Sequence, residues 1–200
     1  MTTKIQICNV ALTVYAGQGR ITSMTEESPA AEACAMHYDD ALRSLLERHW
    51  WTFAASRAFL AQLVNDRPAE WAYRYQVPDD ALAIRWVNDP QVARIMAERG
   101  MSPDVEREVR GESIYCDVAT ATCSFTKLLT VPDGYPQFFS DALSACLGQR
   151  IVQVLTESAA RIQAVHEKEA ELVDRAIMLD MRNEPVRAGG LPSYLSDRGL

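Results

Sequence analysis

The stretch LLERHWWTFAASRAFL, residues 45–60, places three large aromatic side chains directly after a long amphipathic segment. They are Trp50, Trp51 and Phe53. Such side chains each bury about 150 to 250 Å² while a polar edge stays near backbone groups or water. We predict that the three fill the corner where a long helix ends and the chain turns toward a strand region. A subunit contact through one tryptophan is the alternative, and a base-stacking platform is disfavoured because no basic stripe surrounds the cluster.

The composition is that of a folded protein and argues against a nucleic-acid clamp. With 48% hydrophobic residues, a chain of 200 residues suits one domain, or one domain with an appendage. Its 27 acidic residues exceed its 20 basic residues, which gives a formal charge of -7. Because gripping phosphate backbones needs clustered Lys and Arg, nucleic-acid binding is not expected to be the main activity.

Cysteine usage and hydropathy indicate the compartment. The five cysteines are scattered along the chain without a CxxC pair, which predicts reduced, mostly buried thiols and no zinc site. The first four residues lead straight into amphipathic sequence, and no run approaches the ~18 apolar residues of a membrane span. We therefore expect a soluble protein made in the cytoplasm, without a membrane partner.

Apolar residues recur at helical spacing in four segments. The first segment ends at Gly17. The second begins at Ser28-Pro29, where serine is a good N-cap and proline suits the first helical position. Pro185 and the Gly189-Gly190 pair then end regular structure. The predicted helices span residues 4–16, 29–50, 136–154 and 158–182.

Strand periodicity predominates in the middle of the chain. In VPDDALAIRWV, the side chains of Leu82, Ile84 and Trp86 alternate with their neighbours as in a half-buried strand. Further candidate strands flank a predicted turn around Gly111. Together they predict a small antiparallel β meander over about residues 76–131. Within it, residues 89–103 form either a short helix or a mobile excursion.

The predicted fold class is therefore α+β, mainly α. A helical bundle of about four helices holds the small antiparallel β meander between its helix pairs. Residues 1–185 form a single domain, and residues 186–200 form a flexible C-terminal tail. In that tail, Leu191, Tyr194 and Leu195 have no local partner, so we expect them to dock only in an assembled oligomer.

Catalytic and metal-binding patterns are weak. The GQG sequence at residues 17–19 lacks the third glycine and the preceding strand of a dinucleotide fingerprint. Cys34 and His37 have no second pair of ligands at metal-binding spacing. HEKE at residues 166–169 is not the HExxH motif and is interpreted as the solvated face of a helix. We expect no enzyme activity, no cofactor and no bound metal.

Four stretches carry a family resemblance. They are CNVALTVYAGQGRITSMTEESPAAEACAMHYDDALRSLLERHWWTFA, YRYQVPDDALAI, FFSDALSACLGQRIVQVLTESAARIQ and AIMLDMRNEP. The first joins a short helix ending in glycine, an acidic loop, and a long helix closing on an Arg-x-x-Trp aromatic cluster, and the last contains the spacing from Ala176 to Asp180. In this order, over about residues 5–185, they resemble bacteriophage head-to-tail adaptors of the tail tubular protein A family.

The resemblance implies a structural virion protein with no enzyme activity. Such adaptors assemble as an oligomeric ring, typically of twelve copies, beneath the portal protein and join it to the tail nozzle protein of short-tailed phages. Genome DNA passes through the channel without specific binding, and an acidic lumen would let it slide because it repels phosphate. The expected location is the virion tail or neck, after assembly in the host cytoplasm.

The candidate interface residues come from the aromatic cluster and the tail. They are Trp50, Trp51, Leu191, Tyr194 and Leu195. Two other classes of protein stay open at this point. A tail-associated peptidoglycan hydrolase would clear a zymogram, and a small DNA-binding regulator would shift DNA in a gel at low salt.

Overall fold

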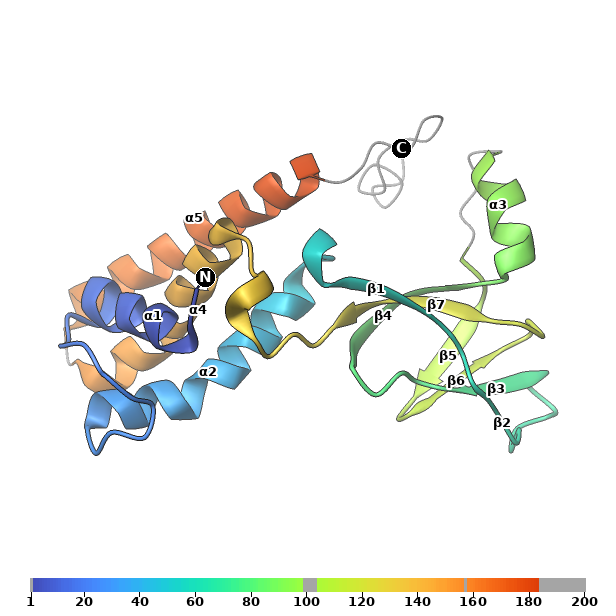
Figure 1. Cartoon of the computed structure of the whole chain (residues 1–200), viewed down its shortest axis with the longest axis horizontal. Coiled ribbons are helices and arrows are strands. Elements are labelled where there is room, and N and C mark those ends of the chain that lie inside the picture. Colours follow the sequence, from blue (N-terminus) through green and yellow to red (C-terminus); the bar gives the residue numbers. More distant parts are fainter. Residues whose placement is uncertain (1, 99–103, 157, 184–200) are drawn as a thin grey trace. The chain divides into compact units, whose positions relative to one another are not determined.

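A computed structural model of the chain describes residues 2–98, 104–156 and 158–183 (Figure 1). Helices take up 51% and strands 19% of the chain, which confirms the α+β, mainly α class. The described residues form two compact units. The helical unit contains the chain up to Ala54 together with Leu128–Asn183, and the strand unit contains Ala55–Lys127. The sequence had predicted one domain over the same range.

The helical unit contains the four helices that the sequence predicted, with ends that differ by at most two residues. They are α1 (Lys4–Val10), which continues as a π-helical segment (Ala11–Ala16), α2 (Pro29–Arg48), α4 (Gln137–Leu155) and α5 (Ala159–Asn183). Short 3₁₀ turns at Thr52–Ala54 and Pro132–Gly134 lie beside the two boundaries with the strand unit.

Local capping explains why the helices begin and end where they do. Ser28 accepts a hydrogen bond from the Ala31 amide at 3.2 Å, and Pro29 occupies the first position of α2. Thr3 and Gln6 form a reciprocal capping box at the start of α1. Gly17 ends the π-helical segment with φ of 68°, a left-handed conformation that glycine adopts without a steric penalty.

The core of the helical unit is centred on α4. Its buried residues lie on nearly every side of the helix, because α4 packs against α2, α5 and the first helix with its π-helical continuation. Gly148 of α4 lies against Tyr15 of the π-helical segment. A Cβ atom at this position would lie 2.7 Å from both Cβ and Cγ of Tyr15. The absence of a side chain at Gly148 therefore lets the Tyr15 ring pack directly on α4.

We expect Gly148→Ala to lower the free energy of unfolding by about 1 to 2 kcal/mol, because overpacking outweighs the ~1 kcal/mol that alanine gains in helix propensity. Urea denaturation followed by far-UV circular dichroism measures the change. Gly134→Ala is the matched control, since no atom lies within 4 Å of a Cβ there. Equal stability of both variants would show that Tyr15 can move aside.

The strand unit contains two antiparallel sheets, so the prediction of a single meander over residues 76–131 was wrong. The strands are β1 (Ala55–Phe59), β2 (Gln62–Leu63), β3 (Tyr73–Gln76), β4 (Ala81–Asn88), β5 (Arg107–Arg110), β6 (Ser113–Cys116) and β7 (Thr122–Lys127). Their order is β1-β7-β4 in one sheet and β2-β3-β6-β5 in the other. Non-consecutive neighbours, such as β1 beside β7, distinguish this topology from a meander.

The two sheets share one hydrophobic core. It consists of Tyr75, Val87, Ile114, Cys116, Ala121, Cys123 and Phe125. The sequence missed β1 because its apolar side chains do not gather on the buried face. Ala58 packs against the core, whereas Phe59 is 74% exposed. A strand with this pattern lacks the apolar alternation on which sequence-based recognition depends.

Strand β4 is recognised correctly, but its inward-facing residues differ from the prediction. Register shifts against β7 occur between Ala81 and Ala83 and between Ile84 and Trp86. Each inserts one extra residue, as a β-bulge does, and so reverses the alternation. The residues that pack on the core are consequently Ala81, Ile84 and Val87, at a spacing of three.

Two further predictions concern the turn around Gly111 and the structure of residues 89–103. Gly111 has φ of 58° and starts the two-residue connection between β5 and β6, as predicted. Of the two alternatives for residues 89–103, the structure has a helix, α3 (Pro90–Glu98), in the part that it describes. The predicted tail, residues 186–200, lies outside the described residues.

Candidate functional site

The aromatic cluster of residues 50–53 is organised around Trp51. This side chain is fully buried, and its Nε1 donates a hydrogen bond to the Leu45 carbonyl oxygen at 2.8 Å. The Trp51 ring meets Phe139 edge to face with 5.0 Å between centroids. Phe53 packs on the same Phe139 ring at 4.7 Å. Edge-to-face pairs of this kind add about 0.5 to 1.5 kcal/mol each beyond the buried area.

Trp51 and Phe53 make ring contacts within the helical unit. Trp51 also stacks on Phe138, and Phe53 contacts Tyr135, so the aromatic partners come from the start of α4 and the turn before it. Trp51 and Phe53 therefore belong to an aromatic core inside the helical unit, and the filling of a corner between helical and strand layers stays a prediction. The reason for this core is the pair of adjacent phenylalanines that opens α4.

A buried carboxylate on α5 fixes the chain that follows α2. Asp180 is fully buried, and its two oxygens accept hydrogen bonds from the Thr52 amide at 2.9 Å and the Thr52 hydroxyl at 2.8 Å. His49 Nε2 lies 3.3 Å from Asp180 Oδ2. Buried polar groups need such partners, because an unsatisfied donor costs about 1 to 3 kcal/mol. The Asp180 carboxylate thus holds residues 49–52 against α5.

A second buried carboxylate, Glu169, lies on the same helix. Only 4% of Glu169 is exposed, and its Oε1 accepts hydrogen bonds from Arg48 Nη1 at 2.5 Å and from Cys146 Sγ at 3.2 Å. Burial, and then the adjacent Glu169 carboxylate, raise the pKa of the Cys146 thiol to about 12. The end of α2 is therefore tied to α5 at Arg48 as well as at Thr52.

The raised pKa of Cys146 predicts a loss of stability in alkali. The thiol of the unfolded chain ionises from its ordinary pKa of 9.0, whereas the folded thiol stays protonated until about 12. The stabilising contribution is full below pH 9 and is lost as the pH rises through 12. We expect Cys146→Ser, which has no group titrating in this range, to lose less stability than the unmodified chain between pH 8 and 11. The free energy of unfolding of both chains is measured by urea denaturation at several pH values. An equal fall of this free energy with pH in the two chains would contradict the prediction.

The contacts of His49, Thr52 and Asp180 hold a segment in place and differ from those of a nucleophile–base pair. In a nucleophile–base pair, the hydroxyl group donates its hydrogen to the imidazole. The Thr52 hydroxyl instead donates to the Asp180 carboxylate. The Asp180 carboxylate therefore accepts the hydrogen bond that an imidazole would accept in such a pair.

The other sequence candidates do not meet at a common site. Cys34 is fully buried on α2, whereas the nearby His37 side chain is partly exposed. In the GQG stretch, the Gln18 side chain caps the end of α4 by donating to the Leu155 carbonyl oxygen at 3.1 Å. Among the described residues, no three His, Cys, Asp or Glu side chains gather as metal ligands. None of the helices in the described ranges is long and apolar enough to cross a bilayer.

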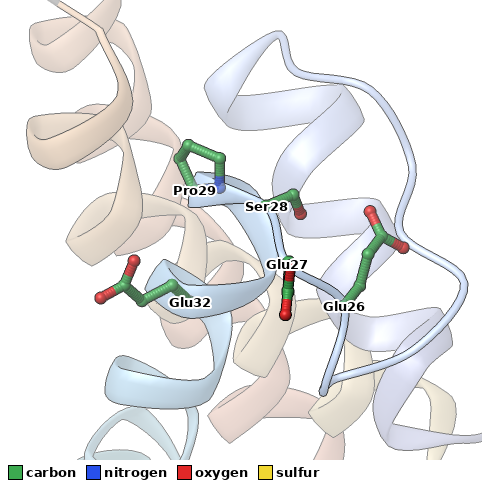
Figure 2. Close-up of a pocket in the computed structure, with 5 residues that line it drawn as sticks. All are labelled: Glu26, Glu27, Ser28, Pro29 and Glu32. Atoms are coloured by element: carbon green, nitrogen blue, oxygen red, sulfur yellow. The ribbon is translucent and has the colours of Figure 1, made fainter.

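A shallow acidic hollow lies at the start of α2. Figure 2 shows its lining, which consists of Glu26, Glu27, Ser28, Pro29 and Glu32. Hydrogen bonds from the Thr22 amide and hydroxyl hold the pKa of Glu26 below its ordinary value, so this carboxylate is charged at neutral pH. A helix N-terminus ordinarily attracts anions, but three carboxylates oppose a phosphate group here.

Sequence reasoning missed the two buried carboxylates. Glu169 belongs to the HEKE stretch that was interpreted as a solvated face, and this interpretation was wrong for Glu169. The available signal was its position on the apolar stripe of α5. Val165, Val173 and Ala176 are buried on the same helix at helical spacing. A charged residue within such a stripe needs a partner, and Arg48, whose side chain is 41% exposed, is that partner.

The predicted interface residues have different outcomes. Trp51 is enclosed in the aromatic core, so its side chain is not available to another subunit. Trp50 is partly exposed. Leu191, Tyr194 and Leu195 lie outside the described residues, and their docking stays a prediction.

The chain matches no protein-family profile and no curated protein sequence. The family resemblance therefore rests on the quoted stretches alone.

Proposed function

We propose that this chain is a structural head-to-tail adaptor of a bacteriophage. In this proposal, a ring of typically twelve copies binds beneath the portal protein, joins it to the tail nozzle protein, and lets genome DNA pass during ejection. It acts in the virion tail or neck after assembly in the host cytoplasm, with no enzyme activity, cofactor or membrane partner.

The observation that carries the proposal is the contact between two motifs from distant parts of the sequence. Arg48 and Trp51 are the ends of the Arg-x-x-Trp pattern, and Asp180 closes the spacing that begins at Ala176. Arg48 binds Glu169 of α5, Trp51 packs on Phe139 of α4, and Asp180 binds Thr52 next to Trp51. The residues that carry the resemblance to adaptors are thus packed together where the end of α2 meets α4 and α5. Such packing is consistent with a structural role.

The helical unit supplies a suitable body for a ring. In the proposal, α1, α2, α4 and α5 act as a bundle of four helices with the strand unit as an insertion in sequence. Several large apolar side chains of this unit are more than 40% exposed. They are Val10, Val14, Met36, Val131, Val154 and Met178. Heterologous contacts, in which different faces of neighbouring copies meet, would bury such side chains and close a ring.

The charge of the chain supports a channel through which DNA slides. A net charge of -7 and the glutamates at the start of α2 disfavour tight contacts with phosphate. A protein that gripped the genome would slow its passage. We therefore expect no specific binding of DNA at physiological salt.

Assembly on a portal tests the proposal. We expect the purified chain to be largely monomeric, with ring formation templated by the portal protein encoded in the same genome. Light scattering should show the mass of the portal rising to a plateau as the chain is added, because a closed ring has a fixed number of places. An unchanged portal mass across a range of salt concentrations would contradict the proposal.

The predicted docking of the tail has its own test. Deleting residues 189–200 should leave the thermal unfolding of the monomer unchanged and reduce its incorporation onto the portal. Normal incorporation of the shortened chain would remove Leu191, Tyr194 and Leu195 from the interface.

A further inference from the structure

Two methionine side chains are exposed on helices at the surface of the helical unit. Met36 on α2 is 65% exposed, and Met178 on α5 is 62% exposed. A single apolar side chain on a protein surface is ordinary and needs no explanation. What sets these two positions apart is the charge around them, which has opposite sign on the two helices.

The surroundings of Met36 are acidic. Glu32 and Asp40 lie four residues before and four residues after Met36, and both side chains are exposed. Because residues four apart on a helix lie on the same face, the three side chains form a row. Asp39 is exposed beside this row, and Arg43 begins the next turn, so acidic charge is in excess. We call Glu32, Met36 and Asp40 the acidic stripe.

The surroundings of Met178 are basic. Arg175 precedes it by three residues and Arg182 follows it by four, and both side chains are exposed. This spacing also places the three side chains in one row. Asp174 is the only other exposed charged residue between positions 174 and 183, so basic charge is in excess. We call Arg175, Met178 and Arg182 the basic stripe.

The two stripes match in length and in charge. At a rise of about 1.5 Å per residue, the acidic stripe spans about 12 Å and the basic stripe about 10.5 Å. Each stripe has a methionine at its centre and charges of one sign at its ends. In the part of the chain that the structure describes, none of these four charged side chains forms an ion pair within its own copy. They are therefore available to a partner of opposite charge.

The stripes lie on different sides of the helical unit, so they do not meet within one copy. The central helix α4 packs against both α2 and α5. Figure 1 shows α2 and α5 along different sides of this unit. The contact between Arg48 and Glu169 joins the two helices about two turns beyond the acidic stripe, which stays exposed. Complementary patches on different sides of one molecule join successive copies and can close a ring.

We propose that the acidic stripe of one copy docks on the basic stripe of a second copy, with Met36 against Met178 at the centre. This contact rests on the proposed ring and names the two faces by which neighbouring copies meet. Exposed ion pairs are individually weak and are screened by salt. The contact is therefore too weak to hold free copies together, and it forms when the portal brings copies side by side.

Charge reversal tests this contact on the portal. The variants reverse the basic stripe (Arg175→Glu with Arg182→Glu), the acidic stripe (Glu32→Arg with Asp40→Arg), or both stripes together. Reversing either stripe alone should raise the chain concentration needed for half-maximal incorporation at least about tenfold, because like charges then meet. Reversing both stripes in one chain should restore incorporation. Glu112→Arg with Asp133→Arg is the matched control, since these exposed carboxylates lie outside both stripes.

The outcomes separate this contact from the proposed function. Circular dichroism checks that each variant is folded. Unchanged incorporation when either stripe alone is reversed would overturn the contact and leave the ring proposal standing. Loss of incorporation that the combined variant does not recover would assign the stripes to the portal or to another partner, and would also overturn the contact. Failure of the unmodified chain to bind the portal would overturn the ring, and the contact with it.

Cross-linking tests whether the two methionine positions face each other in neighbouring copies. A Met36→Cys chain and a Met178→Cys chain are mixed, assembled on the portal and treated with an oxidant. The five natural cysteines are buried and should not compete. We expect disulfide-linked pairs of twice the chain mass in the mixture, and mainly single chains when either variant is assembled alone. Rings that form without linked pairs would overturn the contact.

Discussion

Replacing Trp51 with alanine should lower the free energy of unfolding of the helical unit by about 3 to 5 kcal/mol. The side chain is fully buried, and its loss would leave a cavity against Phe139 and Phe138. It would also leave the Leu45 carbonyl oxygen without its indole donor. Because domains are stable by only about 5 to 15 kcal/mol, this is a large share of the total.

Urea denaturation followed by circular dichroism measures the effect of Trp51→Ala. Phe59→Ala is the matched control, since this aromatic ring is 74% exposed and should change the stability by no more than about 0.5 kcal/mol. If Trp51→Ala kept normal stability and lost only binding to the portal, the side chain would have to act at an interface, and the assignment to a core would fail.

Asp180→Ala should destabilise the chain by about 2 to 4 kcal/mol at neutral pH. The variant removes the acceptor of both the amide and the hydroxyl of Thr52, and it removes the carboxylate beside His49. Buried donors without an acceptor account for most of the expected cost. The segment between α2 and β1 would lose its anchor on α5, so local opening should increase as well.

A comparison within α5 isolates this effect. Asp174→Ala alters an exposed carboxylate on the same helix and should change the stability by no more than about 0.5 kcal/mol. Hydrogen exchange of the Thr52 amide provides a local readout, which should become much faster in Asp180→Ala only. Equal stability of the two variants would mean that water replaces the carboxylate without cost.

The helices could be predicted because their signals are local. Ser28, Pro29 and Gly17 mark helix ends through hydrogen bonds and backbone angles that involve only nearby residues. Periodic apolar residues then define the buried face of each helix. For this reason, the predicted ends of the four helices in the helical unit differ from the structure by at most two residues.

The strand unit and the buried carboxylates depend on partners that are far away in sequence. The pairing of β1 with β7 joins residues 63 to 71 positions apart, and two bulges in β4 place Val87 in the core where alternation predicted Trp86. The apolar stripe of α5 indicates the burial of Glu169, but its partner Arg48 lies 121 residues away. No local pattern contains these pairings.

Electron microscopy of the two purified proteins mixed together tests most directly whether the chain forms the proposed ring on the portal. We predict a closed ring of added density that is coaxial with the portal, with one copy of the chain repeated around the channel. Portal particles that stay bare at saturating concentrations of folded chain would contradict the claim.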